Sequence, residues 1–81
     1  MKILILGASS DIGLELLGLL DKKGIELGAH CFQNDRVFKK FQNSNFSKFK
    51  IFKKNLSSEI EAKRLFKSYI NWSKEIDVLV Q

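Results

Sequence analysis

The pattern at the N-terminus constrains the fold more than any other feature of this chain. The apolar run from Ile3 to Leu6 is followed directly by residues 7 to 13, Gly-Ala-Ser-Ser-Asp-Ile-Gly. A continuous apolar run closed by glycine is typical of a strand buried on both faces of a parallel sheet. Apolar residues then recur at helical spacing from residue 12 to about residue 23, and Gly24 is the expected stop of that helix. The chain therefore begins as strand, tight turn and helix.

The same alternation continues to the end of the sequence. Further strands are expected over residues 25–32, 49–52 and 76–80. A short second helix is expected to begin after Asn34 or Asp35 and to end at the Asn-Ser-Asn stretch 43–45. A third helix is expected to begin at Ser58, which forms a capping box with Glu61, and to bury one face. That face carries Ala62, Leu65, Phe66, Tyr69 and Ile70.

Strands that alternate with helices through short connections form right-handed βαβ units and a parallel sheet. We therefore expect an α/β, Rossmann-type sheet in the order 3-2-1-4, with helices on both faces. The chain stops on Gln81, directly after the fourth strand, which would leave an apolar strand as an open edge. This ending predicts that residues 1–81 are the N-terminal half of a larger, incomplete Rossmann domain.

Residues 7–13 connect an apolar strand to an amphipathic helix, which is the setting that a dinucleotide phosphate loop requires. The N–H groups and the positive dipole end of a helix N-terminus attract a pyrophosphate. Gly7 is expected to turn the chain off the strand, and Gly13 to let the helix approach the sheet closely. Ser9 and Ser10 add hydroxyl donors, and either Ser10 or Asp11 could cap the helix. The cofactor-binding residues predicted in this loop are Gly7, Ser9, Ser10, Asp11, Ile12 and Gly13.

Three segments together resemble the short-chain dehydrogenase/reductase family over the whole chain. Residues 6–13 resemble its Gly-x-x-x-Gly-x-Gly fingerprint, and residues 76–81, Ile-Asp-Val-Leu-Val-Gln, resemble the start of its Asn-Asn-Ala-Gly motif. Residues 55–59, Asn-Leu-Ser-Ser-Glu, resemble the stretch that borders the adenine, which implies a cofactor contact for Asn55 and Leu56. The resemblance is to the family and not to any one substrate, although members that look like 3-oxoacyl-carrier-protein reductases are the most similar.

The sequence departs from that family at three positions. Asp11 replaces the middle glycine of the fingerprint, and a carboxylate there would repel a pyrophosphate unless it turns outward or caps the helix. Asn55 replaces the aspartate after the third strand, and Gln81 replaces the first asparagine of the fourth-strand motif. Asn55 can still accept a hydrogen bond from an adenine amine through its side-chain carbonyl, and Gln81 is a longer amide than the asparagine that it replaces.

The end of the second strand distinguishes NAD from NADP, because a carboxylate there binds the ribose 2′-hydroxyl and repels a 2′-phosphate. The residues at that point are Phe32, Gln33 and Asn34, and the first acid is Asp35, which we interpret as a helix cap. NADP is therefore favoured over NAD, with Gln33, Asn34 and Arg36 as candidates for the 2′-phosphate. Against NADP, Ser10 stands where NADP-using relatives often carry Arg or Lys.

Family members transfer a hydride with a Ser, a Tyr and a Lys that follow the fourth strand, so the resemblance places no catalytic residue in this chain. Tyr69 and Ser73 do not reproduce the Tyr-x-x-x-Lys motif. The resemblance implies that the parent protein is an oxidoreductase that reduces a carbonyl or oxidises a hydroxyl of a small-molecule or acyl-carrier substrate. It also implies a homo-oligomeric parent. Two alternatives stay open: a non-catalytic NAD(P)-binding or sensing module, and a truncated product without activity.

Composition excludes several other classes. The net charge of +5 reflects Lys residues spread along the chain, with the aromatic residues at apolar positions rather than among them, so we expect no nucleic-acid partner. A single cysteine, Cys31, cannot form an internal disulfide, which favours a cytoplasmic setting. Its neighbour His30 should point to the opposite face, so neither a metal site nor a catalytic thiol is expected. The short first apolar run predicts no signal peptide and no membrane span.

Overall fold

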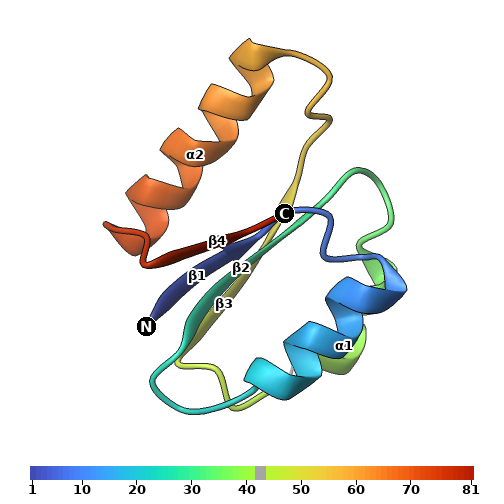
Figure 1. The fold of residues 1–81 in the computed structure, drawn as a ribbon, viewed down its shortest axis with the longest axis vertical. Helices are drawn as coiled ribbons and strands as arrows, with labels where there is room; N and C mark the ends of the chain where they lie inside the picture. The colour runs from blue at the N-terminus through green and yellow to red at the C-terminus, as the bar shows by residue number, and fades with distance from the viewer. Residues whose placement is uncertain (42–43) are drawn as a thin grey trace.

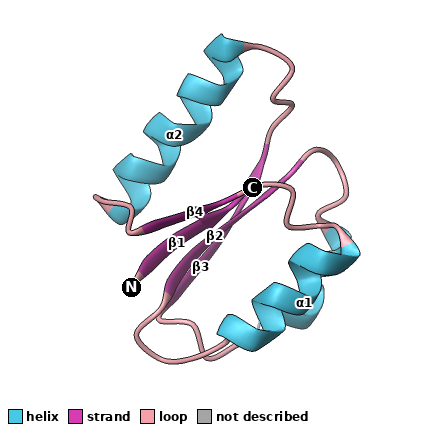
Figure 2. Ribbon diagram, viewed as in Figure 1, coloured by secondary structure: helices cyan, strands magenta, loops and turns pink. Residues whose placement is uncertain are grey.

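The computed structural model describes residues 1–41 and 44–81 and contains one parallel sheet with helices on both faces (Figures 1 and 2). The expected α/β class and the strand order β3-β2-β1-β4 are both confirmed. In chain order the elements are β1 (Lys2–Ile5), α1 (Asp11–Leu20), β2 (Glu26–Cys31), the 3₁₀ helix η1 (Arg36–Phe41), β3 (Lys48–Lys53), α2 (Glu59–Ser73) and β4 (Val78–Val80).

The face of the sheet that carries α1 and η1 holds the larger part of the core. Leu17 of α1 and Phe38 of η1 are almost fully buried against apolar side chains of β1 and β2. Phe49 of β3 joins a group of aromatic rings on this face, and its ring centroid lies 5.5 Å from that of Phe46 in a stacked arrangement. This packing fixes α1, and with it the start of the helix, relative to the end of β1.

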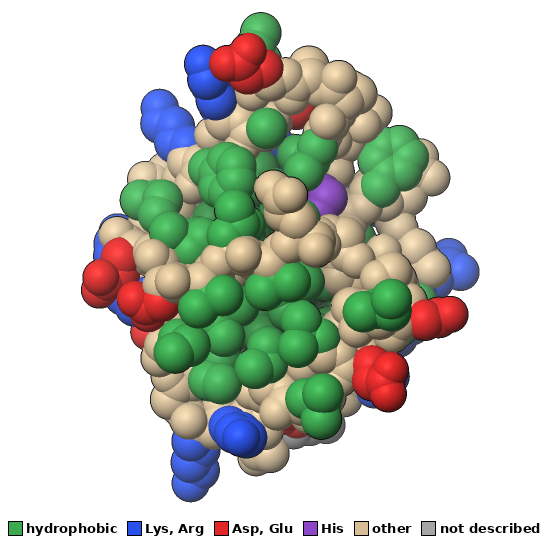
Figure 3. Space-filling view, in the orientation of Figure 1, with side chains coloured by type: hydrophobic (Ala, Val, Ile, Leu, Met, Phe, Trp, Pro, Cys, Tyr) green, Lys and Arg blue, Asp and Glu red, His purple; other side chains and the backbone are tan. Residues whose placement is uncertain are grey.

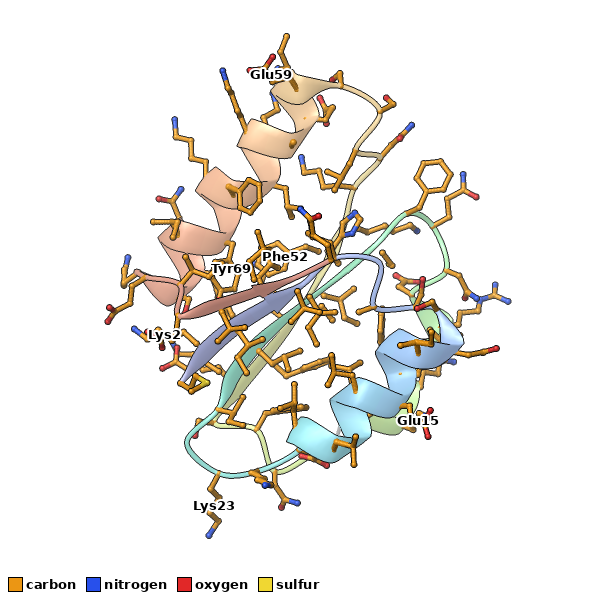
Figure 4. All side chains as sticks on the ribbon, in the orientation of Figure 1. Lys2, Glu15, Lys23, Phe52, Glu59 and Tyr69 are labelled. Atoms are coloured by element: carbon orange, nitrogen blue, oxygen red, sulfur yellow. The ribbon has the colours of Figure 1, made fainter. Side chains whose placement is uncertain are left out.

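The opposite face is covered by α2, and aromatic side chains again make the contact (Figure 4). Tyr69 of α2 is fully buried, and its ring centroid lies 5.9 Å from that of Phe52 on β3. Gly28 of β2 makes room for this pair, because a Cβ atom there would lie 2.8 Å from the Tyr69 ring. A glycine inside a strand usually weakens it, and here it makes room for the aromatic packing.

The boundaries of several elements differ from the sequence-based expectation. α1 ends at Leu20 rather than near Lys23, because Asp21 leaves the helix and its carboxylate accepts a hydrogen bond from the Asn45 N–H. Gly24 still supplies a turn with φ of +87°, four residues after the last residue of the helix. β2 is one residue shorter than expected at each end, β3 one residue longer at each end, and β4 begins at Val78.

The expected second helix is the six-residue 3₁₀ helix η1, which begins at Arg36. Its two buried residues, Phe38 and Phe41, are three apart, and a repeat of three places them on one side of a 3₁₀ helix. Asp35 precedes it, as expected of a cap, and its carbonyl accepts from the Phe38 N–H. The predicted end of this helix at 43–45 lies partly outside the described residues, because Asn43 is not among them.

The third helix begins where the capping box predicts, although only half of the box is formed. The Ser58 hydroxyl accepts from the Glu61 N–H, while the Glu61 carboxylate binds Arg64 instead of the Ser58 backbone. The buried residues of α2 are Leu65, Tyr69 and Ser73. Ile70, which was expected on the buried face, is 39% exposed, because the contact with the sheet runs along the 65–69–73 line.

β4 is the open apolar edge that the sequence predicts. Val78 and Leu79 are both more than one-third exposed, and β4 pairs only with β1 in the described sheet.

Figure 3 shows hydrophobic side chains gathered over the middle of the viewed face, between the two helices. None of the described helices has both the length and the apolar character needed to cross a membrane.

Candidate functional site

The β1–α1 loop, residues 6–10, lies where the winding of the sheet reverses. From β1 the chain passes through α1 to β2 on one side, and from β3 it returns through α2 to β4 on the other side of β1. The Leu6 N–H donates to the Val80 carbonyl at 2.8 Å, so the loop leaves the sheet beside the end of β4. In open α/β sheets, ligands bind at the carboxyl ends of the strands at such a reversal.

Gly7 makes the turn off β1 that the sequence predicts. Its φ of +67° lies in the left-handed region, which a residue with a side chain adopts only at a cost. The next residue, Ala8, is fully buried, and its N–H donates to the His30 carbonyl at 2.8 Å. The turn is therefore bound to the end of β2 immediately after it begins.

Gly13 permits the close approach that the sequence predicts. A Cβ atom at this position would lie 2.6 Å from the carbonyl oxygen of Ala8 and 2.7 Å from its Cα atom. These are backbone atoms that cannot move aside as the end of a side chain could. Only glycine fits here without a shift of the loop or of α1, so Gly13 fixes the distance between them.

Ser10, and not Asp11, caps α1. The Ser10 hydroxyl accepts from the Gly13 N–H at 3.1 Å, and its carbonyl accepts from the Leu14 N–H at 2.9 Å. Asp11 is the first residue of the helix, and its side chain is exposed. The N–H groups of Asp11 and Ile12 belong to the first turn, where a helix has no acceptor of its own for its donors. These two groups are the ones that an anion would bind.

His30 was missed as a site residue by the sequence-based reasoning. It is buried on β2, its Nδ1 atom accepts from the Gly7 N–H at 3.1 Å, and its Nε2 atom lies 2.9 Å from the Lys54 carbonyl oxygen. These partners require a neutral ring with its proton on Nε2. His30 thus joins the loop after β1 to the end of β3. Its position near the carboxyl end of a central strand was the one available signal.

The residues predicted at the end of β2 lie outside the sheet. Phe32 is 53% exposed, and Gln33 and Asn34 are exposed as well. The Asp35 N–H donates to the Gln33 carbonyl at 3.1 Å, which turns the chain toward η1. The hydrogen bond between the Ala8 N–H and the His30 carbonyl places this segment beside the β1–α1 loop, at the carboxyl ends of the strands.

The residues predicted after β3 also lie at the carboxyl ends of the strands. They differ in burial. The Lys54 N–H donates to the Cys31 carbonyl, which keeps the chain beside β2 up to residue 54. Asn55 is exposed, whereas Leu56 is half-buried and packs on the aromatic cluster beneath α2. Ser9 is half-buried and lies between the two glycines of the loop.

Cys31 lies on the α1 face of β2, opposite to His30, as strand alternation predicts. Burial raises the pKa of its thiol, and the nearby charge of Asp35 adds to the rise, while Lys53 opposes it. A thiol held in its neutral form is a poor nucleophile.

In residues 1–41 and 44–81, no three His, Cys, Asp or Glu side chains come together as metal ligands.

A cavity of about 650 Å³ lies away from the β1–α1 loop, between η1 and β3. Its lining includes Asp35 just before η1, Arg36 at the start of η1, and Ser44 and Ser47, which precede β3. Of the predicted cofactor ligands only Arg36 borders this cavity, so it is a feature separate from the loop.

No protein-family profile matches this chain, and no curated protein matches it either. The fold is Rossmann-like, which is compatible with nucleotide binding.

Proposed function

We propose that the chain binds the pyrophosphate of a nicotinamide dinucleotide at the N-terminus of α1, as the cofactor-binding part of a short-chain oxidoreductase. The observation that carries the proposal is the contact of Gly13 with Ala8, where a Cβ atom would lie 2.6 Å from a backbone oxygen. This contact brings the first turn of α1 against the end of β1, at the reversal of the sheet. Close packing of the helix against the strand is the role of the last glycine in a dinucleotide-binding loop.

The residues around the loop suit an anionic ligand. The N–H groups of Asp11 and Ile12 would hold the phosphates, with the positive end of the α1 dipole behind them. Ser10 orients this turn through its bond to the Gly13 N–H, and its hydroxyl proton is not used in that bond. The side chain of Asp11 opposes the ligand, but its exposure to water screens that repulsion.

For the adenosine end we propose the segment after β2 and the residues that follow β3. Phe32, Gln33 and Asn34 are exposed beside the loop, and the first carboxylate after β2 belongs to Asp35. Gln33, Asn34 and Arg36 would bind a 2′-phosphate, which favours NADP over NAD. Asn55 and Leu56 would border the adenine.

The reaction of the parent protein, hydride transfer to a carbonyl or from a hydroxyl group, remains part of the same proposal. The bound nicotinamide would supply the hydride chemistry. The residues of this chain would bind and orient the cofactor, and none of them is assigned to proton transfer to a substrate. A small-molecule or acyl-carrier substrate and a homo-oligomeric parent are proposed on the resemblance alone.

The experiment is an equilibrium titration of the folded 81-residue chain with NADPH and with NADH, in which calorimetry measures the heat of binding. We expect saturable binding of one NADPH per chain and weaker binding of NADH. The Asn34→Asp variant should reverse that preference, because a carboxylate accepts from a 2′-hydroxyl and repels a 2′-phosphate. Heat changes without saturation for both nucleotides, from a chain with a folded circular dichroism spectrum, would refute the proposal.

A further inference from the structure

β3 is the terminal strand of the sheet on the side away from β4. It pairs with β2 over all six residues from Lys48 to Lys53, and no other strand in the described part of the chain pairs with its outer side. Alternate residues of a terminal strand turn their N–H and C=O groups outward, where another extended chain can bind them.

The cavity of about 650 Å³ between η1 and β3 lies along this edge. Its lining combines the apolar side chains of Phe38, Phe49 and Ile51 with Arg36 and Lys39 of η1. Ile51 is 36% exposed although it is a large apolar residue. An exposed strand edge beside a groove whose lining includes apolar side chains is an arrangement that domains use to bind extended peptides.

The two faces of β3 differ in chemistry. On the η1 side, Phe49 packs into the aromatic group. On the α2 side, the Lys48 ammonium lies 5.7 Å from the Trp72 ring centroid, and the Lys50 ammonium lies 5.3 Å from that of Phe52. The η1 face of the edge thus presents Phe49 and Ile51 beside the cations of η1, and the α2 face presents the ammonium groups of Lys48 and Lys50.

We propose that the β3 edge binds an extended peptide segment of a partner protein in which acidic and apolar residues alternate. The segment adds to the sheet as a further strand. Its apolar side chains lie in the groove beside Phe49 and Ile51, and its carboxylates face Lys48 and Lys50. Successive side chains of a strand point to opposite faces of the sheet, so a peptide that alternates apolar and acidic residues fits both faces of β3.

Charge favours this occupant over a second copy of the chain. Two β3 edges would bring Lys48, Lys50 and Lys53 of each copy close together, and like charges across a strand pair are destabilising. The β4 strand of a second copy, Val78 to Val80, contains no acid to face these lysines. A nucleic acid would supply negative charge, but Phe41 and Phe46 of the aromatic group are buried and offer no ring for bases to stack on.

The experiment measures binding of dye-labelled synthetic peptides to the folded chain by fluorescence anisotropy. One peptide of about seven residues alternates Glu and Val, and the control has the same composition with the Glu and Val residues in separate blocks. We expect the alternating peptide to bind at least about tenfold more tightly. The amide NMR signals of residues 48–53 should shift with it. Equal affinity for the two peptides, or shifts confined to other residues, would overturn the proposal.

A charge reversal tests the same contact independently. In the Lys48→Glu, Lys50→Glu variant, affinity for the Glu/Val peptide should fall about tenfold, and a Lys/Val peptide should bind instead. The matched control, Lys63→Glu with Lys67→Glu, makes the same change of charge on the exposed side of α2 and should keep the original preference. Three results would each contradict the peptide proposal. The first is an unchanged peptide preference in the Lys48→Glu, Lys50→Glu variant, and the second is self-association through β3 in sedimentation. The third is tighter binding of an oligothymidylate at the amides of residues 48–53.

Discussion

The backbone N–H of Gly7 donates to the Nδ1 atom of His30, with 3.1 Å between the two nitrogen atoms. The other ring nitrogen of His30 lies 2.9 Å from the Lys54 carbonyl oxygen. One buried side chain on β2 therefore holds both the turn after β1 and the end of β3. The position of the candidate loop depends on this side chain as well as on the glycines of the loop.

Replacing His30 should damage both stability and ligand binding. His30→Phe keeps a ring of similar size but leaves the Gly7 N–H without its acceptor, which should cost about 1–3 kcal/mol of unfolding free energy. Urea denaturation measures this loss, and titration with NADPH measures the loss of affinity. His30→Gln retains a donor and an acceptor and should recover part of both. Equal stability of His30→Phe and the unmodified chain would show that the bond contributes nothing.

Gly13→Ala should disrupt the loop, because its Cβ atom would lie 2.6 Å from the Ala8 carbonyl oxygen. We expect a loss of about 1–3 kcal/mol of unfolding free energy and loss of NADPH binding. Gly18→Ala is the matched control in the same helix, since a Cβ atom there meets no atom within 4 Å. That variant should be more stable by about 0.5–1 kcal/mol, because alanine favours the helix. The same thermal shift in both variants would contradict the packing role of Gly13.

Asp11→Asn should strengthen NADPH binding. The exposed carboxylate lies in the first turn of α1, beside the N–H groups assigned to the phosphates. Removing its charge should improve affinity by about two- to fivefold at low salt, and less at high salt. Glu15→Gln removes an exposed charge one turn further along α1 and should have the smaller effect. Weaker binding by Asp11→Asn would indicate that the carboxylate itself contacts the ligand.

Tyr69→Phe should leave the chain as stable as before or stabilise it by up to about 1 kcal/mol. The Tyr69 hydroxyl is buried and forms no hydrogen bond of ordinary geometry in the described residues, although a weak interaction with Ser73 opposes the rise of its pKa, so its removal deletes a poorly paired polar group. Tyr69→Leu, which also removes the ring beneath Gly28, should be clearly destabilising. Thermal unfolding of both variants measures the contrast, and a large loss in Tyr69→Phe would reveal a bond that the hydroxyl does make.

Stability should decline in alkaline solution. Burial raises the pKa of the Cys31 thiol above its ordinary value of 9.0 and that of the Tyr69 hydroxyl above 10.0. Well below pH 9, both groups are protonated in the folded and in the unfolded chain. As the pH rises past these values, the unfolded chain loses its protons first, so the free energy of unfolding falls. In the Cys31→Ala variant, the fall of the urea midpoint that begins near pH 9 should be absent, and only the fall due to Tyr69 at higher pH should remain. An unaltered pH profile would exclude Cys31 as its source.

Much of the architecture could be predicted from the sequence because hydrophobic periodicity and glycine positions act locally. The two loop glycines and the Ser58 cap are where these rules place them. Helix ends were predicted less well. Asp21 ends α1 by a contact with Asn45, which is 24 residues away and invisible in a local pattern.

The candidate site was predicted only in part for the same reason. The roles of Gly7 and Gly13 follow from the local turn, whereas the role of His30 depends on β1, β2 and β3 lying side by side. The groove beside β3 was not predicted, because its lining comes from η1, from the residues just before β3 and from β3 itself, which only the fold brings together.

An amide NMR titration of the ¹⁵N-labelled chain with NADPH tests most directly whether the N-terminus of α1 binds the dinucleotide. We expect saturable shifts for residues 7–13 and for Phe32 to Asn34, with the signals of Asp11 and Ile12 among the most affected. No saturable shift in a folded chain, or saturable shifts confined to residues outside these two segments, would contradict it.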